Sequence, residues 1–213
     1  MSKTIAIDGP AAAGKGTLAK RLAAHLGYAL LDTGLLYRAV GHRVLAAGAD
    51  PADADAATRE ALALKASDLE GDHLRLDETA QAASKVAVVP AVREALLAFQ
   101  RTFAADPPAG APGAILDGRD IGTVVCPDAQ AKLFVTASVE VRAARRVKEL
   151  RERGQEVIEA RVLQDLKDRD TRDRERATAP LKAADDALNL DTSGLDPDQA
   201  FEKALAFISD RIA

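Results

Sequence analysis

A short apolar strand that breaks into a glycine-flanked loop restricts this chain more than any other segment. Residues 5–17 read Ile-Ala-Ile-Asp-Gly-Pro-Ala-Ala-Ala-Gly-Lys-Gly-Thr, and the spacing Gly9-x-x-x-x-Gly14-Lys15 is typical of a loop that wraps around phosphate. Glycines let successive backbone N–H groups point inward at an anion. Leucines then recur at helical spacing from residue 18 to residue 26, so the loop opens onto a helix N-terminus. The segment predicts a polyphosphate site between a strand and a helix.

The loop departs from its commonest form at one position. Gly16 follows Lys15, where a Ser or Thr usually binds Mg²⁺ directly, and Thr17 comes one residue later. We therefore expect the metal to be held mainly through water and substrate phosphates, which suits an ion that loses its water shell reluctantly. Lys15 is expected to reach the outer phosphates as a mobile point charge.

Composition limits the class of protein and its partners. The chain has 213 residues, which fits one compact α/β domain, and its net charge of −4 gives no positive field for nucleic acid or an anionic membrane. Apolar runs fall far short of the ~18 residues of a membrane span, and the first strand begins too early for a signal peptide. Cys126 is the single cysteine. We expect a cytoplasmic protein, monomeric because no exposed apolar stripe is evident, without a nucleic-acid or membrane partner.

Strand and helix patterns alternate along the chain, which predicts an α/β fold with a mainly parallel sheet covered on both faces. Strands are expected at 3–8, 28–32, 113–117, 131–137 and 187–191, and helices at 15–26, 34–47, 55–68, 90–104, 139–153, 156–173 and 196–211. Residues 50–90 interrupt the alternation and indicate an inserted helical subdomain. Ligands bind at the carboxyl ends of such strands, where Asp8, Asp32, Asp117 and Asp191 stand. For Asp191 the role of turn former fits best.

Segment 140–176 is rich in arginine but is not a nucleic-acid patch. It holds 12 of the 29 basic residues together with 10 acidic ones. Most of it, up to Arg161, is interpreted as a solvent-exposed helix with i,i+4 ion pairs such as Glu149 with Arg153.

The end of that segment calls for another explanation. Arg169, Arg172 and Arg176 share one helical face and would repel each other unless anions lie there. Phosphoryl transfer needs such cations, because the migrating group spreads its negative charge over three oxygens.

Further candidates stand just after the predicted strands. Arg38 follows the second strand and Arg119 the third, so both can hold a second phosphate opposite the loop. Asp117 ends the third strand, as does the metal-positioning Asp of many phosphate-loop enzymes, and is expected to hold a water of the Mg²⁺ shell. Asp120 competes for that role or else hydrogen-bonds a substrate. The histidines lack metal-ligand spacing, and Cys126 is interpreted as a small apolar filler.

Runs of residues over nearly the whole chain resemble, in the same order, the bacterial cytidylate kinase family. A phosphate loop with Gly16 after Lys15 is similar to that of nucleoside monophosphate kinases. The other matching runs are Leu31-Asp32-Thr33-Gly34-x-x-Tyr37-Arg38, Ala83-Ser84-x-Val86-Ala87, Val92-Arg93-Glu94-Ala95-Leu96, Asp117-Gly118-Arg119-Asp120-Ile121-Gly122-Thr123-Val124-Val125 and Arg169-Asp170-x-x-Asp173-Arg174-x-Arg176-x-x-x-Pro180-Leu181. Spacing and composition alone predict no more than a P-loop phosphotransferase.

The resemblance implies an enzyme of pyrimidine nucleotide metabolism that transfers the γ-phosphate of ATP to CMP or dCMP in the presence of Mg²⁺. It implies a P-loop NTPase-type fold with a five-stranded parallel sheet flanked by helices. It also implies a single domain, 1–213, with a nucleoside-monophosphate-binding insertion at about 38–100 and a mobile lid at about 148–166.

The resemblance also assigns residues. ATP is expected to lie against Gly9, Pro10, Ala11, Ala12, Ala13, Gly14, Lys15, Gly16 and Thr17. The expected substrate-binding residues are Thr33, Tyr37, Arg38, Ser84, Arg93, Asp120, Arg169, Asp173 and Arg176. Among them, Arg38 is expected to take the CMP phosphate together with Arg119, and Tyr37 to pack nearby. Cytosine is expected to be read by Ser84, Arg93 and Asp120. Arg169 and Asp173 are expected to contact the sugar, and Arg176 to neutralise phosphate. The charge-stabilising catalytic set is Lys15, Arg119, Arg169 and Arg176, and Asp117 holds Mg²⁺ through water.

The base assignment has a chemical reason, but the insertion is short. Cytosine offers an N4 amino donor to a carboxylate, and N3 and O2 acceptors to Arg and Ser. About 35 residues separate Gly48 from Ser84, against a β-rich extension in the family's longer members, and Asp68–Asp77 has room for a small hairpin at most. Discrimination against UMP therefore stays open.

Two other functions remain possible on the sequence alone. One is a P-loop kinase for another small molecule, which the base-reading set disfavours. The other is a non-enzymatic nucleotide-binding module. The Asn-Lys-x-Asp tetrapeptide of GTPases is absent, which disfavours a switch protein.

Overall fold

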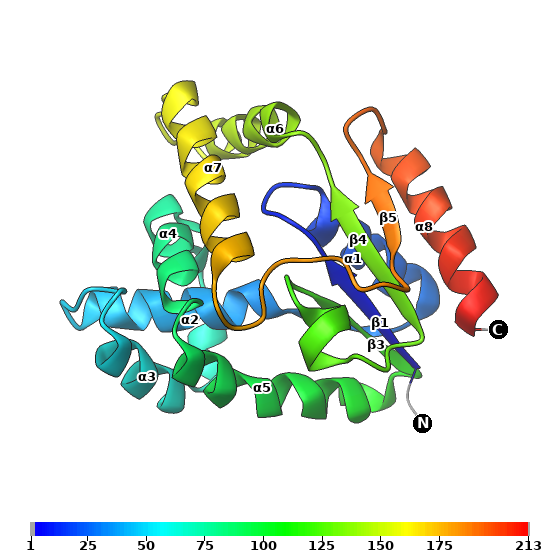
Figure 1. Ribbon diagram of the computed structural model, residues 1–213, viewed down its shortest axis with the longest axis horizontal. Helices are drawn as coiled ribbons and strands as arrows, with labels where there is room; N and C mark the ends of the chain where they lie inside the picture. The colour runs from blue at the N-terminus through cyan, green and yellow to red at the C-terminus, as the bar shows by residue number, and fades with distance from the viewer. Residues whose placement is uncertain (1–2, 213) are drawn as a thin grey trace.

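Five parallel strands form the sheet at the centre of the computed structural model, which describes residues 3–212 (Figure 1). Their order is β2-β3-β1-β4-β5, and their bounds are β1 Lys3–Asp8, β2 Ala29–Asp32, β3 Gly113–Asp117, β4 Ala131–Thr136 and β5 Leu188–Asp191. The predicted α/β fold with a five-stranded parallel sheet is confirmed, and each predicted strand agrees to within one residue at either end. Met1, Ser2 and Ala213, which belong to the predicted domain 1–213, lie outside the described residues.

The two faces of the sheet bury different side chains, because alternate residues of a strand point to opposite sides. Ile5 and Ile7 pack with α1 (Lys15–Leu26) and α8 (Pro197–Ile212) on one face. Leu116 points to the other face, which is covered by α5 (Pro90–Ala105) and by a single turn of π-helix, Ile121–Val125. With both faces covered, the carboxyl ends of the strands are the part of the sheet left open to a ligand.

One side of the sheet carries a helical lobe, named here the α2–α5 lobe, made of α5 and of α2 (Thr33–Ala46), α3 (Ala54–Leu62) and α4 (Asp77–Val86) (Figure 1). It has an aliphatic core of its own, in which Val40, Val86 and Val92 are fully buried. Helices α2 and α4 approach closely at Gly41, where a Cβ would lie 2.8 Å from the backbone nitrogen of Ala83. This close packing fixes α4, and the residues it carries, against α2.

Parts of this lobe differ from the prediction. The helix expected at 55–68 ends at Leu62, and α4 is a further helix within the predicted helical subdomain at 50–90. Asp68 accepts a hydrogen bond of 2.9 Å from the backbone N–H of Lys65 and so starts a separate 3₁₀ turn, Ala66–Leu69. A second 3₁₀ turn, Asp72–Arg75, follows in place of a hairpin.

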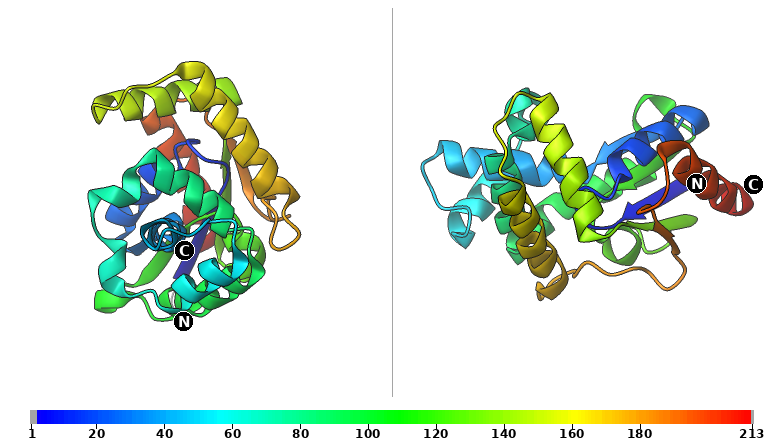
Figure 2. Two further views of the ribbon diagram at one scale, coloured as in Figure 1. Left: turned by 90° about the vertical axis from the view of Figure 1, so that its left-hand side faces the viewer. Right: turned by 90° about the horizontal axis from the view of Figure 1, so that it is seen from above.

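Helices α6 (Val139–Glu152) and α7 (Glu159–Glu175) form a hairpin that stands over the phosphate loop (Figure 2). An apolar seam joins the two helices, and Ala11 of the loop packs against it. Buried Arg142 of α6 makes paired hydrogen bonds of 3.0 and 2.6 Å with Asp170 of α7, and donates to the backbone oxygen of Ala11 at 3.2 Å. The hairpin is thereby anchored to the loop.

Gly9 is expected to tolerate no side chain. Its φ is 144°, and a Cβ would lie 1.9 Å from the backbone oxygen of Val135. Because β1 and β4 are hydrogen-bonded neighbours, neither backbone can move away. Gly9→Ala should therefore lower the free energy of unfolding by about 3 kcal/mol or more, measured in urea. Gly194→Ala is the control, since that glycine faces open space and its substitution should change stability by less than about 0.5 kcal/mol. Equal, small changes for both variants would contradict the described loop geometry.

Candidate active site

The phosphate loop joins the end of β1 to the start of α1. Gly14 is the N-cap of α1 and takes a left-handed conformation with φ 91°, and Ala12 has φ 59°. The first backbone N–H groups of α1 have no helical partners, and they face the loop with the positive end of the helix dipole. Lys15 folds back over the loop and donates a hydrogen bond of 3.0 Å to the backbone oxygen of Pro10. The geometry of Gly9–Thr17 is that of an anion site.

Lys15 and Asp117 lie together at the ends of β1 and β3. Lys15 Nζ is 3.6 Å from Asp117 Oδ1, and both side chains are buried. Burial lowers the pKa of Lys15 to about 8, and the charges of Arg119 and Arg169 act in the same direction, while Asp117 opposes them. Burial raises the pKa of Asp117, and Lys15 counteracts that rise. The ammonium group is thus incompletely neutralised, and a bound polyphosphate would stabilise its charge.

Asp8, the last residue of β1, binds the turn that follows Asp120, a role that the sequence did not indicate. Its carboxylate accepts hydrogen bonds of 2.7 Å from the backbone N–H groups of Ile121 and Gly122. Burial raises the pKa of Asp8 to about 7, although these two hydrogen bonds act to lower it. The carboxylate therefore fixes the first two residues of the π-helical turn, directly after Asp120.

Two side chains, those of Asp32 and Thr33, fix the start of α2. Asp32 is the N-cap and accepts a hydrogen bond of 3.0 Å from the backbone N–H of Gly34. Thr33 Oγ1 donates instead to the backbone oxygen of Asp117 at 2.8 Å. Thr33 therefore ties α2 to β3, and its hydroxyl hydrogen is already in use.

Five cations, named here the Lys15 cluster, gather beyond the strand ends: Lys15, Arg38 of α2, Arg119 after β3, Arg146 of α6 and Arg169 of α7. Burial lowers the pKa of Arg169 to about 9, and the charges of Arg119, Arg38 and Arg146 add to this. Arg169 Nε is buried without a hydrogen-bond partner among residues 3–212. An unpaired buried donor costs about 1–3 kcal/mol, so the cluster has the character of a site made for an anion.

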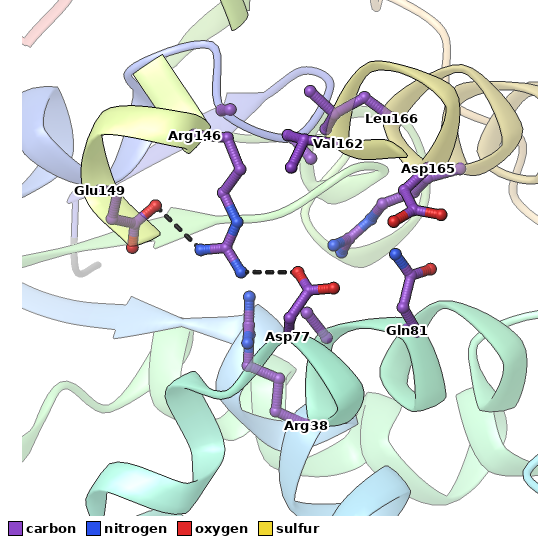
Figure 3. Close-up of a pocket in the computed structure, with 12 residues that line it drawn as sticks. Arg38, Asp77, Gln81, Arg146, Glu149, Val162, Asp165 and Leu166 are labelled. Atoms are coloured by element: carbon purple, nitrogen blue, oxygen red, sulfur yellow. Dashed lines mark hydrogen bonds and ion pairs between the residues drawn. The ribbon is translucent and has the colours of Figure 1, made fainter. Parts of the chain in front are cut away.

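A cavity of about 130 Å³ lies where the phosphate loop, α2, α4, α6 and α7 meet (Figure 3). Arg38 and Arg146 enter it from the α2–α5 lobe and from the hairpin, respectively. Arg146 donates to Glu149 at 2.9 Å on its own helix and to Asp77 of α4 at 3.0 Å. The loop, the lobe and the hairpin therefore border one cavity, whose lining includes three arginines and three carboxylates.

A second group of side chains, named here the Asp120 cluster, consists of Tyr37, Arg93, Asp120 and Arg176. One oxygen of Asp120 accepts a hydrogen bond of 2.5 Å from Arg93 Nη2, and the other lies 3.5 Å from Arg176 Nη2. The guanidinium carbon of Arg93 is 5.5 Å from the centre of the Tyr37 ring. Fixed acceptors and donors beside an aromatic ring suit a flat heterocycle.

Asp173 of α7 joins the two clusters. It accepts a hydrogen bond of 2.9 Å from Arg119 Nε. Burial acts to raise the pKa of Asp173, but Arg119, Arg169 and Arg176 together lower it below its ordinary value. The carboxylate is therefore ionised at neutral pH and holds Arg119 toward α7.

Ser84 is buried on α4 near the Asp120 cluster. It lies one turn before Ala87, whose backbone oxygen accepts a hydrogen bond of 3.3 Å from Arg93. The Ser84 hydroxyl accepts a hydrogen bond of 3.1 Å from Arg172 of α7.

Arg176, which is predicted to neutralise phosphate, lies beside Asp120 in the structure. Burial and Arg93 lower its pKa, whereas Asp120 and Asp173 raise it. It therefore belongs to the Asp120 cluster rather than to the cations around Lys15. Since both oxygens of Asp120 face arginines, Asp117 is the better placed of the two carboxylates for a metal near the loop.

A second pocket, of about 320 Å³, opens beside Gly14 and Thr17 on the side of α8. Arg145 of α6 crosses it and donates to the hydroxyl and backbone oxygens of Thr192 at 3.0 and 2.7 Å. The rest of its wall is largely apolar, from Leu18, Val135, Leu195, Pro197 and Ala200. A ligand with phosphates in the loop would place an attached ring here.

The interpretation of Arg142 to Arg161 as a solvent-exposed helix is wrong for three arginines of α6. Arg142 is buried, Arg145 spans the second pocket, and Arg146 lines the first. The predicted pair of Glu149 with Arg153 is present at 2.8 Å. The sequence signal that was missed is the place of these arginines on α6, since they flank the buried stripe of Ala143, Val147 and Leu150.

Comparison with known proteins decides the family. The family model described as cytidylate kinase matches residues 5–210 of the chain. The chain belongs to the cytidylate kinase family. It is therefore a kinase, and the loop and the two clusters form the candidate active site of a cytidylate kinase family member.

Relatives of the same family match over nearly the whole length. The cytidylate kinase of Paramagnetospirillum magneticum is 64% identical over 99% of this chain and 100% of its own. That of Rhodospirillum rubrum is 59% identical over 96% of each. A solved structure of an uncharacterized protein from Eubacterium ventriosum has a TM-score of 0.54 at 16% identity, covering 99% of this chain and 100% of that one, and supports the fold alone.

Proposed function

We propose that the protein transfers the γ-phosphate of ATP to CMP and dCMP, giving ADP and the cytidine diphosphates. Family membership supports this, and one observation carries it. Arg169 Nε is buried without a hydrogen-bond partner among residues 3–212, and the charge of Arg169 lowers the pKa of both Lys15 and Asp173. A cation in that position is stabilised when two phosphate-bearing ligands meet there.

ATP would bind with its phosphates against Gly9–Thr17 and its adenine in the pocket beside Arg145. Mg²⁺ fits next to them, because the buried Asp117 carboxylate lies beside Lys15 and is 3.7 Å from where a Cβ of Gly16 would be. Within residues 3–212, no three His, Cys, Asp or Glu side chains are grouped to hold a metal. Asp117 would therefore hold Mg²⁺ through water, with phosphate oxygens as further ligands, and the ion would neutralise phosphate charge.

CMP would bind on the opposite side of the Lys15 cluster. Arg38 and Arg119 would take its phosphate, and Asp173 with Arg169 its sugar hydroxyls. In the Asp120 cluster, Asp120 would accept from the N4 amino group of cytosine while Ser84 and Arg93 donate to the acceptors of the ring, and Tyr37 packs beside it. Arg176, revised from the predicted role, would hold Asp120 in place.

The chemistry asks little of a general base. The attacking CMP phosphate oxygen is already anionic, so catalysis rests on alignment and on charge stabilisation. Lys15, Arg119 and Arg169 would neutralise the transferring phosphoryl group. The α6–α7 hairpin, which includes the predicted lid at 148–166, would exclude water and prevent simple hydrolysis of ATP.

An assay of ADP release with a panel of acceptors tests the proposed function. Each of CMP, dCMP, UMP and AMP is offered with ATP, and turnover is expected with CMP and dCMP well above the other two. Preference for another acceptor would indicate a different small-molecule kinase. Slow ATP hydrolysis that ignores every monophosphate would indicate a non-enzymatic nucleotide-binding module.

Asp120 is expected to set the preference for cytosine over uracil. Asp120→Asn keeps the shape of the side chain but adds an amide donor, which suits O4 of uracil instead of N4 of cytosine. The ratio of kcat/KM for CMP to that for UMP should fall about tenfold or more, since a good paired base contact is worth about 1–3 kcal/mol. Asp120→Ala should also weaken discrimination, at an added loss of stability because Arg93 and Arg176 lose their partner. An unchanged ratio in both variants would remove Asp120 from this role.

Lys15 should give the reaction an alkaline limit. Its pKa is lowered to about 8 by burial and by Arg119 and Arg169, so the free enzyme loses this positive charge as the pH rises through 8. We expect kcat/KM for ATP to fall above about pH 8, and kcat to hold to higher pH because bound phosphate favours the protonated amine. Lys15→Arg should shift this limit upward, whatever its absolute rate, because a guanidinium keeps its proton. A wild-type profile that is flat to pH 9.5 would contradict this assignment.

We further propose that the enzyme acts as a monomer in the cytoplasm, within pyrimidine nucleotide metabolism. None of its described helices has the length and apolar character needed to cross a membrane. Light scattering at micromolar concentration tests the monomer.

A further inference from the structure

Arg172 of α7 contacts the serine that stands beside the Asp120 cluster. Its Nε donates a hydrogen bond of 3.1 Å to Ser84 Oγ, and its Nη2 donates one of 3.3 Å to Gln81 Oε1 on the same helix, α4. The two contacts use two nitrogens of one planar group, so the guanidinium is fixed in orientation as well as in place.

This contact decides where the Ser84 hydroxyl hydrogen can go. Arginine has donors and no acceptor, so Ser84 Oγ must be the acceptor in the contact. The hydrogen of that hydroxyl is then free to turn away from Arg172 and donate elsewhere. Without Arg172, the hydroxyl would be free to rotate, and the hydrogen would have no preferred direction.

The position of Arg172 on α7 places it with the site. Arg169 lies three residues before Arg172, Asp173 lies one residue after it, and Arg176 lies four residues after it. Arg169 and Arg176 belong to the two clusters, which Asp173 joins. Arg174 lies elsewhere on α7, with a 58% exposed side chain that reaches Asp170 at 3.7 Å. Two arginines two residues apart thus have different surroundings, and one is a matched control for the other.

Arg172 also connects two parts of the molecule. It reaches from α7 of the hairpin to α4 of the α2–α5 lobe, separately from the ion pair of Arg146 with Asp77. The position of Ser84 relative to the Asp120 cluster is therefore set by α7 as well as by its own helix.

We propose that Arg172 is a positioning residue for nucleobase binding: it holds Ser84 so that the serine hydroxyl donates to an acceptor atom of the pyrimidine ring. The proposal rests on the proposed function, because it takes the ligand of the Asp120 cluster to be a pyrimidine monophosphate. Arg172 acts on the ligand through Ser84, so removing either residue removes the same interaction.

A double-mutant cycle on the full-length enzyme tests this. Arg172→Met and Ser84→Ala should each raise KM for CMP about tenfold, as expected when a buried acceptor of the ring loses its donor, and leave KM for ATP within about twofold. The double variant should raise KM for CMP by no more than about twofold beyond the larger single effect. Arg174→Met, the control, should change neither constant by more than about twofold.

The outcomes separate the possible failures. Effects that multiply, to about a hundredfold in the double variant, would overturn a role through Ser84. A purely structural role predicts that Arg172→Met lowers the melting temperature and raises both KM values alike. Equilibrium titration of CMP into Arg172→Lys, which keeps the charge without the planar fork, should show binding weaker than wild type and stronger than Arg172→Met. Loss of CMP phosphorylation by the wild type would overturn the proposed function as well, whereas an active wild type with an unaffected Arg172→Met overturns this inference alone.

Discussion

Lys15→Met is expected to lower kcat by about 10³-fold or more while the protein stays folded. The Lys15 ammonium group is held over the phosphate loop by Pro10 and lies 3.6 Å from Asp117, so it is placed to reach the outer phosphates of a nucleotide bound in the loop. Its loss removes charge stabilisation that is made in the transition state, and kcat therefore suffers more than substrate binding.

The fold should survive this substitution. Burial lowers the pKa of Lys15, so its charged form destabilises the folded state when no ligand is bound. Burial also raises the pKa of Asp117, so this carboxyl group can take up a proton when Lys15 is replaced. We expect the free energy of unfolding in urea to change by less than about 1 kcal/mol. Lys203→Met, on the exposed face of α8, is the control and should leave both kcat and stability unchanged. More than a tenth of wild-type kcat in Lys15→Met would contradict the proposed mechanism.

Arg169→Met is expected to inactivate the enzyme and to stabilise the empty protein. kcat should fall by about 10²–10³-fold, because a fixed donor aimed at the transferring phosphoryl group is lost. Without ligands, however, Arg169 Nε has no hydrogen-bond partner among residues 3–212, and burial together with nearby arginines lowers the pKa of Arg169 although Asp173 opposes this. Replacing such a buried charge with an apolar side chain of similar length should raise the free energy of unfolding by about 1–3 kcal/mol.

Arg142→Met is the matched control for the stability effect. Arg142 is also a buried arginine, but it makes two hydrogen bonds to Asp170 and further bonds to backbone oxygens. Its removal leaves an unpaired buried carboxylate and should cost about 3–5 kcal/mol. If the free energy of unfolding in urea rises for Arg169→Met and falls for Arg142→Met, then Arg169 serves a ligand and Arg142 serves the fold. Equal destabilisation would show that Arg169 is structural.

These two arginines also show what the sequence can and cannot predict. The strands, the phosphate loop and α1 follow from local pattern alone, because alternating burial and glycine spacing have fixed consequences for the backbone. Arg142 and Arg169 look alike in the sequence, since both stand on charged helices among acidic residues. Only the crossing of α6 over α7 decides that Arg142 forms paired hydrogen bonds with Asp170, whereas Arg169 Nε is left without a hydrogen-bond partner in the described part of the chain.

Side chains that act across elements were the hardest to predict. Arg146 meets Asp77 on α4, a helix whose bounds the predicted helical subdomain at 50–90 did not give. Arg176 shares a helical face with Arg169, yet it reaches Asp120 rather than the cations around Lys15. Spacing places Arg169 and Arg176 on one side of α7, but the neighbours that each side chain meets are set by β3 and by the α2–α5 lobe.

The central claim is that two nucleotides bind at once, with their phosphates meeting at the Lys15 cluster. A dinucleotide in which five phosphates join adenosine to cytidine tests it most directly in a calorimetric titration. We predict one molecule bound per chain, displaced by ATP and by CMP, with a Kd at least about 100-fold below that of ATP. Binding no tighter than that of ATP, or displacement by one of the two nucleotides alone, would contradict the account.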